Sequence, residues 1–174
     1  MRSTVLCCCV LAVVLGWGAG TAQPAAAGVR LTAPEQTVLT LINHFRAAHG
    51  CRALRVVSSL ERASRSHSRD MLKRGYFSHS SGGSSYATRL RAFGYSAAGC
   101  TCWRVGEIIG WSRDRAAAAS VFRRWIKSPV HRAVILQRSF SEIGVGNTRG
   151  ALCGLTGVSM FTVDFGRRVK QDAA

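Results

Sequence analysis

The sequence predicts one α+β domain, built as a three-layer α/β/α sandwich around a mainly antiparallel sheet. Two observations give this class. Apolar residues recur at helical spacing over the first half of the chain, and two strand-like runs close it without a helix between them. Strands joined by a loop pair as an antiparallel hairpin, and helices elsewhere must cover the faces of the sheet. At 174 residues the chain has room for one core of ordinary size, with no internal repeat.

The beginning of the chain has the composition of an export signal. A basic residue precedes an apolar run, residues 5–15, and small residues follow as far as Ala27. This order is typical of a secretory signal peptide, and the run is shorter than the roughly 20 residues of a membrane span. We therefore expect cleavage after Ala27, with Ala22 as the second choice, so that residues 1–27 are the signal and 28–33 a flexible lead-in. The sequence therefore predicts a secreted, extracellular protein without a transmembrane segment once the signal is removed.

Helices dominate the first half of the predicted domain. One helix covers residues 35–49, a second is capped by Ser58 or Ser59 and ends before Gly75, and a short third covers residues 86–93. Each carries apolar residues on one face, and glycines follow the helix ends, where a left-handed residue commonly stands. A short extended link joins the first two helices.

The second half alternates strands and helices. Residues 103–111 are rich in β-branched and aromatic side chains, which favour a strand. Ser112 is expected to cap the following helix, which Pro129 breaks because the residue before a proline disfavours the helical conformation. A helical turn follows the proline. Residues 140–147 and 158–165 then form the closing hairpin, joined by a loop that contains glycines.

Four cysteines remain once the signal is removed, and an even number in a secreted chain predicts disulfides. Cys100 and Cys102 are separated by one residue, so a bond between them would be strained. We expect one of them to pair with Cys51 and the other with Cys153. A zinc cluster of the four is disfavoured because the chain has no C-x2-C pair.

The charge of the chain is unevenly balanced, with 24 lysines and arginines against 8 acidic residues and a net charge of +16. Such a balance favours polyanionic neighbours: nucleic acid, anionic lipid head groups or acidic cell-wall polymers. The arginines are spread along the chain rather than clustered. That distribution favours a solvated extracellular surface over a specific nucleic-acid site.

Several ionisable side chains stand out by their positions. Glu107 lies inside a strand-like run, where a carboxylate needs a partner or a raised pKa. His79 follows two aromatic residues at the mouth of a Ser/Gly-rich loop, and His131 follows the proline break. The plain alternatives are a strand-end ion pair for the glutamate and an exposed loop position for His79. His67, on the apolar face of the second helix, is expected to be a hydrogen-bonded core histidine rather than a ligand.

Five short motifs occur in a fixed order along the chain: Phe77-Ser78-His79, Gly106-Glu107, Trp125-x-x-Ser128-Pro129-x-His131-Arg132, Ile143-Gly144-Val145-Gly146 and Asp164-Phe165-Gly166. Together they resemble the CAP superfamily of cysteine-rich secretory proteins, insect antigen 5 and plant pathogenesis-related proteins. The branch that they resemble most comprises bacterial secreted proteins with a single such domain. The resemblance covers residues 34–166, leaves a polar tail at 167–174, and implies the three-layer sandwich and an extracellular location.

The resemblance also implies a cleft in which two histidines and two acidic residues meet in many members. Carried over to this chain, the histidines are His79 and His131 and the first acid is Glu107, whereas Ser128 stands where the second acid is found. Two imidazoles with a carboxylate nearby would suit a divalent metal such as zinc. The absent acid removes the obvious base of a hydrolase. Two other family positions also differ, with Ile108 after the Gly-Glu pair and Val130 before the second histidine.

Three functions are compatible with these observations. We favour a secreted, non-enzymatic binding module for lipid or cell-envelope ligands, because Ser128 replaces the acid that catalysis would use. A metal-dependent hydrolase or peptidase is the second, and a polyanion binder using the basic surface is the third. We assign no catalytic residue and no cofactor beyond a divalent metal, and we expect a monomer without a specific nucleic-acid partner.

Overall fold

The structure, a computed structural model, describes residues 29–98 and 100–170, so the predicted signal peptide and the last four residues lie outside the described part. Within these residues the chain forms five helices and four strands, an α+β arrangement as predicted. None of these helices is both long enough and apolar enough to cross a bilayer. In chain order the elements are α1 (Ala33–Ala48), β1 (Arg55–Val56), α2 (Ser58–Arg74), α3 (Tyr86–Ala92), β2 (Cys100–Ser112), α4 (Ala117–Lys127), α5 (Pro129–Ile135), β3 (Glu142–Leu152) and β4 (Leu155–Lys170).

The four strands form one sheet in the order β1-β3-β4-β2. β4 pairs antiparallel with β3 on one side and with β2 on the other, and the short β1 pairs parallel with the start of β3. The sheet is therefore mainly antiparallel. The link between the first two helices is a strand because its backbone bonds to the chain around β3: Arg55 N donates to Ser141 O, and Val57 N donates to Ile143 O, both at 3.0 Å.

The closing hairpin is longer and tighter than the sequence predicts. Residues 148–157, expected as a loop, continue both strands, because their backbones pair across the ladder as far as Leu152. The strands meet at Cys153 and Gly154, whose φ angles are 47° and 82°. Two successive positive φ angles are what the common two-residue hairpin turn requires. β4 also continues to Lys170, so the first part of the predicted polar tail is strand.

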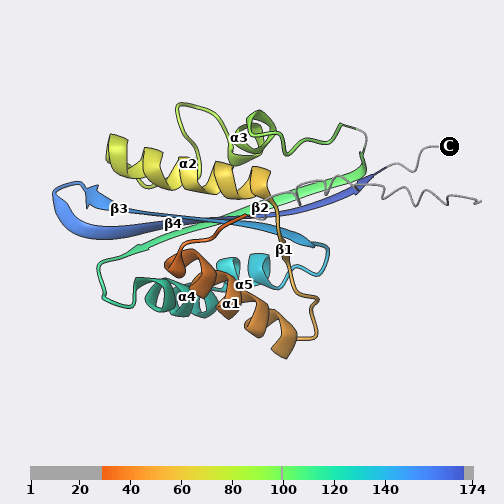
Figure 1. The fold of residues 1–174 in the computed structure, drawn as a ribbon, viewed down its shortest axis with the longest axis horizontal. Helices are drawn as coiled ribbons and strands as arrows, with labels where there is room; N and C mark the ends of the chain where they lie inside the picture. The colour runs from red at the N-terminus through yellow and green to blue at the C-terminus, as the bar shows by residue number, and fades with distance from the viewer. Residues whose placement is uncertain (1–28, 99, 171–174) are drawn as a thin grey trace, which may run out of the picture.

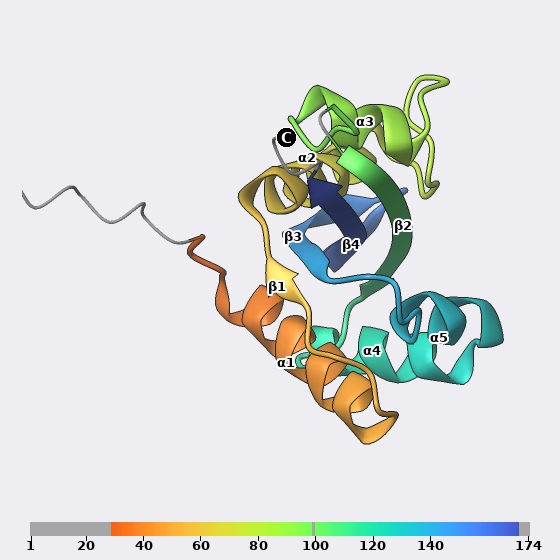
Figure 2. The same cartoon turned by 90° about the vertical axis from the view of Figure 1, so that its right-hand side faces the viewer.

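Helices lie on both faces of the sheet. Figure 1 shows α2 and α3 above the strands and α1, α4 and α5 below them, and Figure 2 shows the same separation from the side. The largest buried cluster fills the space between the sheet and the lower helices, and includes Val38, Ile42, Trp125, Phe161 and Phe165. A smaller cluster joins α2 to α3 through Leu60, Ala63, Leu90 and Tyr95.

α2 lies directly on β3 because the strand has glycines at the contact. A Cβ atom on Gly144 or Gly146 would overlap the backbone of the helix. The hydroxyls of Ser64 and Ser68 lie within this close contact, since each hydroxyl oxygen is 3.1 Å from the carbonyl oxygen of one of these glycines. The Ile-Gly-Val-Gly motif of the sequence therefore serves the packing of a helix on a strand.

Two helix starts differ from the prediction. α2 begins at Ser58 with Val57 as its N-cap, one residue earlier than a serine cap implies. α4 begins only at Ala117. Ser112 is the last residue of β2, and its hydroxyl accepts a hydrogen bond from the backbone N–H of Asp114 at 3.1 Å. The serine thus closes a turn before the helix instead of capping it.

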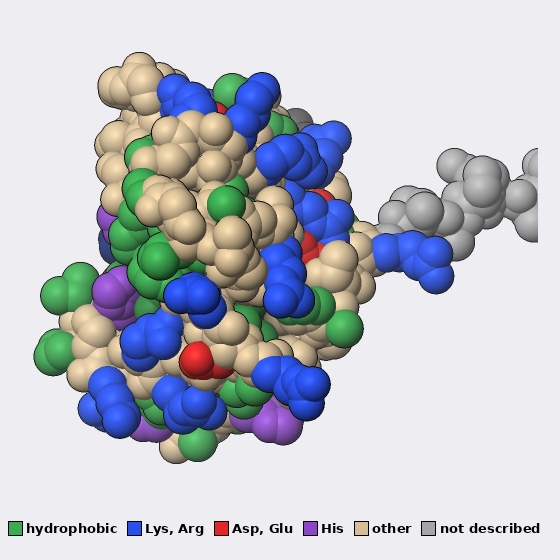
Figure 3. All heavy atoms as spheres, turned by 90° about the vertical axis from the view of Figure 1, so that its left-hand side faces the viewer, with side chains coloured by type: hydrophobic (Ala, Val, Ile, Leu, Met, Phe, Trp, Pro, Cys, Tyr) green, Lys and Arg blue, Asp and Glu red, His purple; other side chains and the backbone are tan. Residues whose placement is uncertain are grey.

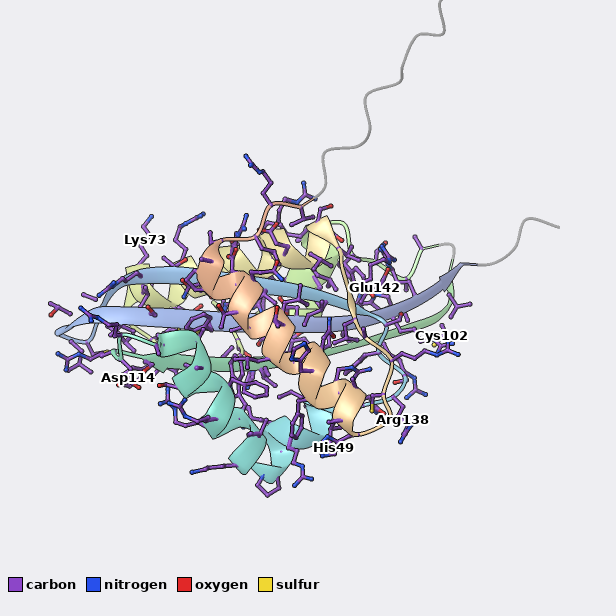
Figure 4. The ribbon with its side chains drawn as sticks, turned by 60° about the horizontal axis from the view of Figure 1, so that its bottom comes forward. His49, Lys73, Cys102, Asp114, Arg138 and Glu142 are labelled. Atoms are coloured by element: carbon purple, nitrogen blue, oxygen red, sulfur yellow. The ribbon has the colours of Figure 1, made fainter. Side chains whose placement is uncertain are left out.

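The expected disulfides are not formed by the described cysteines, since Cys51, Cys102 and Cys153 are free thiols. Cys153 lies in the β3–β4 turn, whereas Cys102 pairs with Val169 near the other end of β4. A strand of 16 residues is roughly 50 Å long at ~3.3 Å per residue, so these two cannot meet. The thiol of Cys153 contacts the carbonyl of Gly75, the residue that follows α2. Lys73 lies in the last turn of α2, and Figure 4 shows Cys102 far from this lysine. The side chain of Cys100 lies outside the description.

Candidate functional site

Three of the four predicted cleft residues meet in one pocket. His79, Ser128 and His131 line a cavity of about 920 Å³, between the loop after α2, the end of β2 and the helices α4 and α5. The fourth residue, Glu107, lies behind His79 on β2. Its side chain is fully buried, whereas half of the His79 side chain is exposed. The glutamate therefore acts on the pocket through the histidine.

Both carboxylate oxygens of Glu107 are engaged. Oε1 lies 2.7 Å from Nδ1 of His79, and Oε2 accepts a hydrogen bond from Nη2 of Arg89. A carboxylate only accepts, so Nδ1 of the histidine carries the proton of this bond and Nε2 is the ring nitrogen left for other partners. The result is an oriented imidazole, with its buried carboxylate held by an arginine from α3.

The loop that carries the first histidine is anchored to α2. Nε2 of His67 lies 2.9 Å from the carbonyl oxygen of Ser78. Asp70 accepts hydrogen bonds from the hydroxyls of Tyr76 at 2.5 Å and Ser81 at 2.7 Å. These two residues lie before and after His79, so Asp70 ties both ends of the loop to α2. The prediction that His67 is a hydrogen-bonded core histidine is confirmed, and burial lowers its pKa.

His131 stands in the first turn of α5, and its Nδ1 lies 2.8 Å from the hydroxyl oxygen of Ser128. Burial lowers the pKa of His131, and the positive charge that His79 can carry lowers it further. The imidazole is therefore neutral at pH 7. The serine at the position of the family's second acid orients this histidine without placing a negative charge beside it.

A buried arginine holds the chain that follows α5. The side chain of Arg46, on α1, has no exposed surface. Its guanidinium donates to the carbonyls of Arg52 at 3.0 Å, Ile135 at 2.6 Å, Gln137 at 3.1 Å and Phe140 at 3.3 Å. Four carbonyls thus take the place of a carboxylate partner. Three of the four carbonyls belong to residues 135–140, so the guanidinium holds the end of α5 and the chain that follows it against α1.

The long wall of the pocket is apolar and closely packed. Nε1 of Trp125 donates to the carbonyl of Ile109 at 2.9 Å, which fixes the indole against β2. Gly110 permits this approach, since a Cβ there would stand 2.7 Å from Cγ1 of Val121 and 3.0 Å from the indole nitrogen. The apolar lining residues are Phe77, Ile109, Trp111, Val121 and Trp125.

One end of the pocket is charged. Arg113 and Arg124 line it, and each donates to a backbone carbonyl, so both side chains are held in place. Asp114 lies between them in sequence, and hydrogen bonds from Ser120 and Ser112 lower its pKa. Basic side chains are common elsewhere too: on the face drawn in Figure 3, lysines and arginines lie in separate groups among hydrophobic and other side chains.

The site offers little to a metal ion. Within the described ranges, no group of three or more His, Cys, Asp or Glu side chains is placed to hold one. The oxygens of Glu107 are already taken by His79 and Arg89, so the carboxylate orients a possible ligand instead of being one. The Nε2 atoms of His79 and His131 remain as candidate ligands. The Nδ1 atom of each ring is already hydrogen-bonded, and in metal sites such second-shell bonds orient the histidine ligands.

Sequence reasoning missed three residues on which the site depends. Arg46 and Arg89 are two of many basic residues, and nothing in their spacing marks them as buried. Asp164 enters only as part of the Asp-Phe-Gly motif, although it lies opposite Glu107 in the ladder of β2 and β4. The sequence does contain a signal for Asp164, because an acidic residue inside an apolar strand is the same unusual feature that singles out Glu107.

Comparisons with known proteins agree with this geometry. The family model described as CAP, cysteine-rich secretory protein family, matches residues 39–161. The uncharacterized protein YkwD of Bacillus subtilis is 31% identical over 118 residues, which are 67% of this chain and 43% of that protein, so the chain spans less than half the length of this relative.

Two solved structures share the fold. An outer surface protein of Borrelia burgdorferi superposes with a TM-score of 0.65 at 17% identity, over 80% of this chain and 96% of that one. An extracellular protein containing an SCP domain from Bacillus anthracis gives a TM-score of 0.62 at 23% identity, over 80% of this chain and 45% of that one.

Proposed function

This chain belongs to the CAP family of cysteine-rich secretory proteins, and from that premise we propose that it is a secreted, non-enzymatic module that binds an amphiphilic ligand in the pocket of His79 and His131. The export signal predicted from its sequence and the extracellular and outer-surface descriptions of its structural relatives support secretion. A lipid or a lipid-like component of the cell envelope is the ligand class that we infer.

The observation that carries this proposal is the uneven lining of the pocket. A cavity of about 920 Å³ is large enough for part of an acyl chain, and its long wall is made of aromatic and aliphatic side chains. Arg113 and Arg124 stand at the polar end, fixed by their bonds to backbone carbonyls. An apolar wall beside two arginines, only one of whose charges is offset by Asp114, is complementary to an anionic head group on an apolar tail.

The same residues argue against hydrolysis as the main activity. A hydrolytic site needs a base within hydrogen-bond reach of its water. Glu107 is bonded to His79 and Arg89, and Ser128 occupies the position of the second acid. Asp114 is the one carboxylate among the described residues that line the pocket, and its lowered pKa makes it a weak base. The pocket therefore offers a hydrolase no free carboxylate base of ordinary strength, and only the imidazoles of His79 and His131 could accept a proton.

Direct binding tests this proposal. Trp111 and Trp125 line the pocket, so tryptophan fluorescence should report titration with oleate or with phosphatidylglycerol micelles. We expect W111A to weaken binding about tenfold, and L155A to leave it unchanged because that exposed residue lies outside the pocket. Equal affinities of both variants and the native protein, or a signal that vanishes in high salt, would instead indicate general polyanion binding.

Zinc binding is a separate proposal for the same pocket. Two free Nε2 atoms with oriented rings suit a weak site, of micromolar or poorer affinity, that needs both His79 and His131. Zinc titration of the native protein, H79A and H131A tests it, and equal affinity in all three would exclude these histidines as ligands. The hydrolase alternative is checked with the same proteins: zinc-loaded native protein would have to cleave a peptide or ester that H131A does not.

A further inference from the structure

A second buried acid lies directly behind the Glu107–His79 pair. Glu107 and Asp164 are partners in the antiparallel ladder of β2 and β4, so their side chains leave the same face of the sheet side by side. Asp164 has no exposed surface, and the side chain of Glu107 has none either. Two carboxyl groups thus meet in a site without water contact, where two negative charges would repel strongly.

The hydrogen bonds of Asp164 leave one oxygen without a donor. Oδ2 accepts from the hydroxyl of Ser64 at 2.7 Å, whereas Oδ1 is buried and has no donor among the described residues. The neighbour of Asp164 across the ladder is Glu107, whose carboxyl group is the other acid in this buried site. Two ionised carboxylates could not bond to each other, because neither carries a donor. A proton carried by one of the two carboxyl groups would remove the second charge and supply a donor.

The surroundings decide which carboxyl group carries that proton. Glu107 faces the guanidinium of Arg89 and Nδ1 of His79, both of which favour its negative charge. Asp164 faces only the hydroxyl of Ser64 on the other side. Burial raises the pKa of Asp164, the neighbouring Glu107 raises it further, and Arg89 opposes both without cancelling them. His67 is the other titratable group close to this cluster, and burial favours its neutral form.

We propose that Asp164 is a positioning residue that stays protonated in the folded protein and donates this proton to Glu107, so that a single carboxylate charge orients His79. The chain of contacts then runs Ser64–Asp164–Glu107–His79, from the core of α2 to the pocket. It fixes the tautomer of His79 with its proton on Nδ1 and presents Nε2 to whatever the pocket binds. This role does not depend on the identity of the ligand, so it stands apart from the proposed lipid binding.

Infrared spectroscopy of the native protein and D164N tests the protonation state. Asparagine has the same shape, and its amide can donate to Glu107 while accepting from Ser64. The difference spectrum at pH 7 should contain the C=O stretching band of a protonated carboxylic acid, present in the native protein and absent in D164N. Glu61, another buried acid whose pKa is raised by burial, contributes equally to both proteins and cancels. A difference spectrum with only carboxylate bands would overturn the proposal.

The positioning role has its own readout in ¹⁵N NMR of the histidine ring. D164N should keep the Nδ1–H tautomer of His79 and leave the ¹⁵N signals of its ring nearly unchanged, because one neutral donor replaces another. If Asp164 were ionised, the same substitution would remove a negative charge beside Glu107 and shift the ring signals. D164A, which cannot donate to Glu107, should alter the tautomer signal, and an unchanged signal in a folded D164A would refute the positioning role.

Discussion

Gly144 runs directly beneath Leu60: a Cβ atom on the glycine would stand 2.2 Å from the carbonyl carbon of Leu60. The neighbouring atom belongs to a helix backbone, so no side-chain rotation can relieve the overlap. We expect G144A to lower the free energy of unfolding by about 3 kcal/mol or more, above the usual range for overpacking, because α2 must move as a whole. Urea unfolding followed by circular dichroism measures this.

A glycine on the same strand provides the control. A Cβ on Gly150 would meet only the side chain of Leu72, with Cδ1 at 3.2 Å and Cβ at 3.9 Å, and the end of that flexible side chain can move. G150A should therefore change the unfolding free energy by less than about 1 kcal/mol. Similar losses of unfolding free energy in G144A and G150A would contradict the close packing of α2 on β3.

Arg46 gives a second prediction for stability. R46M keeps the apolar stem but leaves four carbonyl groups without their donor, and we expect a loss of about 3 kcal/mol or more in unfolding free energy. Hydrogen exchange should also quicken in residues 135–140, since three of those carbonyls lie there. R52M, at an exposed arginine in the following loop, should do neither. An unaltered exchange pattern in R46M would show that the guanidinium does not hold this segment.

Asp70 makes the loop of His79 sensitive to acid. Burial raises the pKa of Asp70, but hydrogen bonds from Arg74, Tyr76 and Ser81 outweigh this and bring it to about 2. A lowered folded-state pKa stabilises the protein above the unfolded value near 4, and this stability is lost as the pH falls through 2. Because the side chain is partly exposed, we expect D70N to cost only about 1 kcal/mol at pH 7.

The measurement is the difference in unfolding free energy between native protein and D70N across the acid range. The difference should shrink from pH 5 to pH 2, and D70N should exchange amide hydrogens of residues 77–81 faster at pH 7. D114N removes a carboxylate that also accepts from hydroxyls but lies outside this loop. It should leave the exchange of residues 77–81 unchanged, and equal effects of both variants would argue against the anchor.

His131 should titrate below the ordinary range of histidine, near 6.5, because burial and His79 both lower its pKa. The folded protein then binds fewer protons here than the unfolded chain, so this residue's contribution to stability is lost as the pH falls from about 6.5 through the folded pKa. NMR titration should show the pKa rising in H79Q, which removes the neighbouring charge but keeps the burial. An unchanged pKa in H79Q would mean that the two imidazoles do not interact.

The cysteines can be checked by chemical labelling. Cys153 is exposed and should react with a thiol reagent within the fastest phase, whereas the buried Cys51 should react only on unfolding. C153S should abolish the fast phase and C51S should leave it intact. Because the described cysteines form no disulfide, a reducing agent should not lower the melting temperature. A marked decrease would restore the disulfide prediction.

The elements that the sequence predicts well have strong local signals. Pro129 marks the start of α5, and Gly75, with φ of 66°, ends α2 as a left-handed residue. The histidine–serine pair of the pocket follows from helical geometry, since Ser128 and His131 are three residues apart around one helix start. The hairpin is different: residues 148–157 contain three glycines and were expected as a loop, although their backbones pair across the ladder as far as Leu152.

Long-range partners could not be predicted. Arg89 meets Glu107 only because α3 folds over β2, and Arg46 finds its carbonyls about 90 residues further along the chain. Neither contact leaves a periodic trace in the sequence. The free thiols show the same limit, since an even number of cysteines indicates pairing only where the fold brings them together.

The glycines beneath α2 also restrict the register of the sheet. Gly144, Asp164 and Glu107 form one rung across β3, β4 and β2. A slip of β3 by a single residue would direct the side chain of Val145 at the backbone of α2, where not even a methyl group fits. The glycine therefore permits only one alignment of β3 with β4 beneath α2, the one that places Asp164 opposite Gly144 and within reach of the Ser64 hydroxyl. A packing requirement on β3 thus determines which residue of β4 meets the polar side chain of the helix.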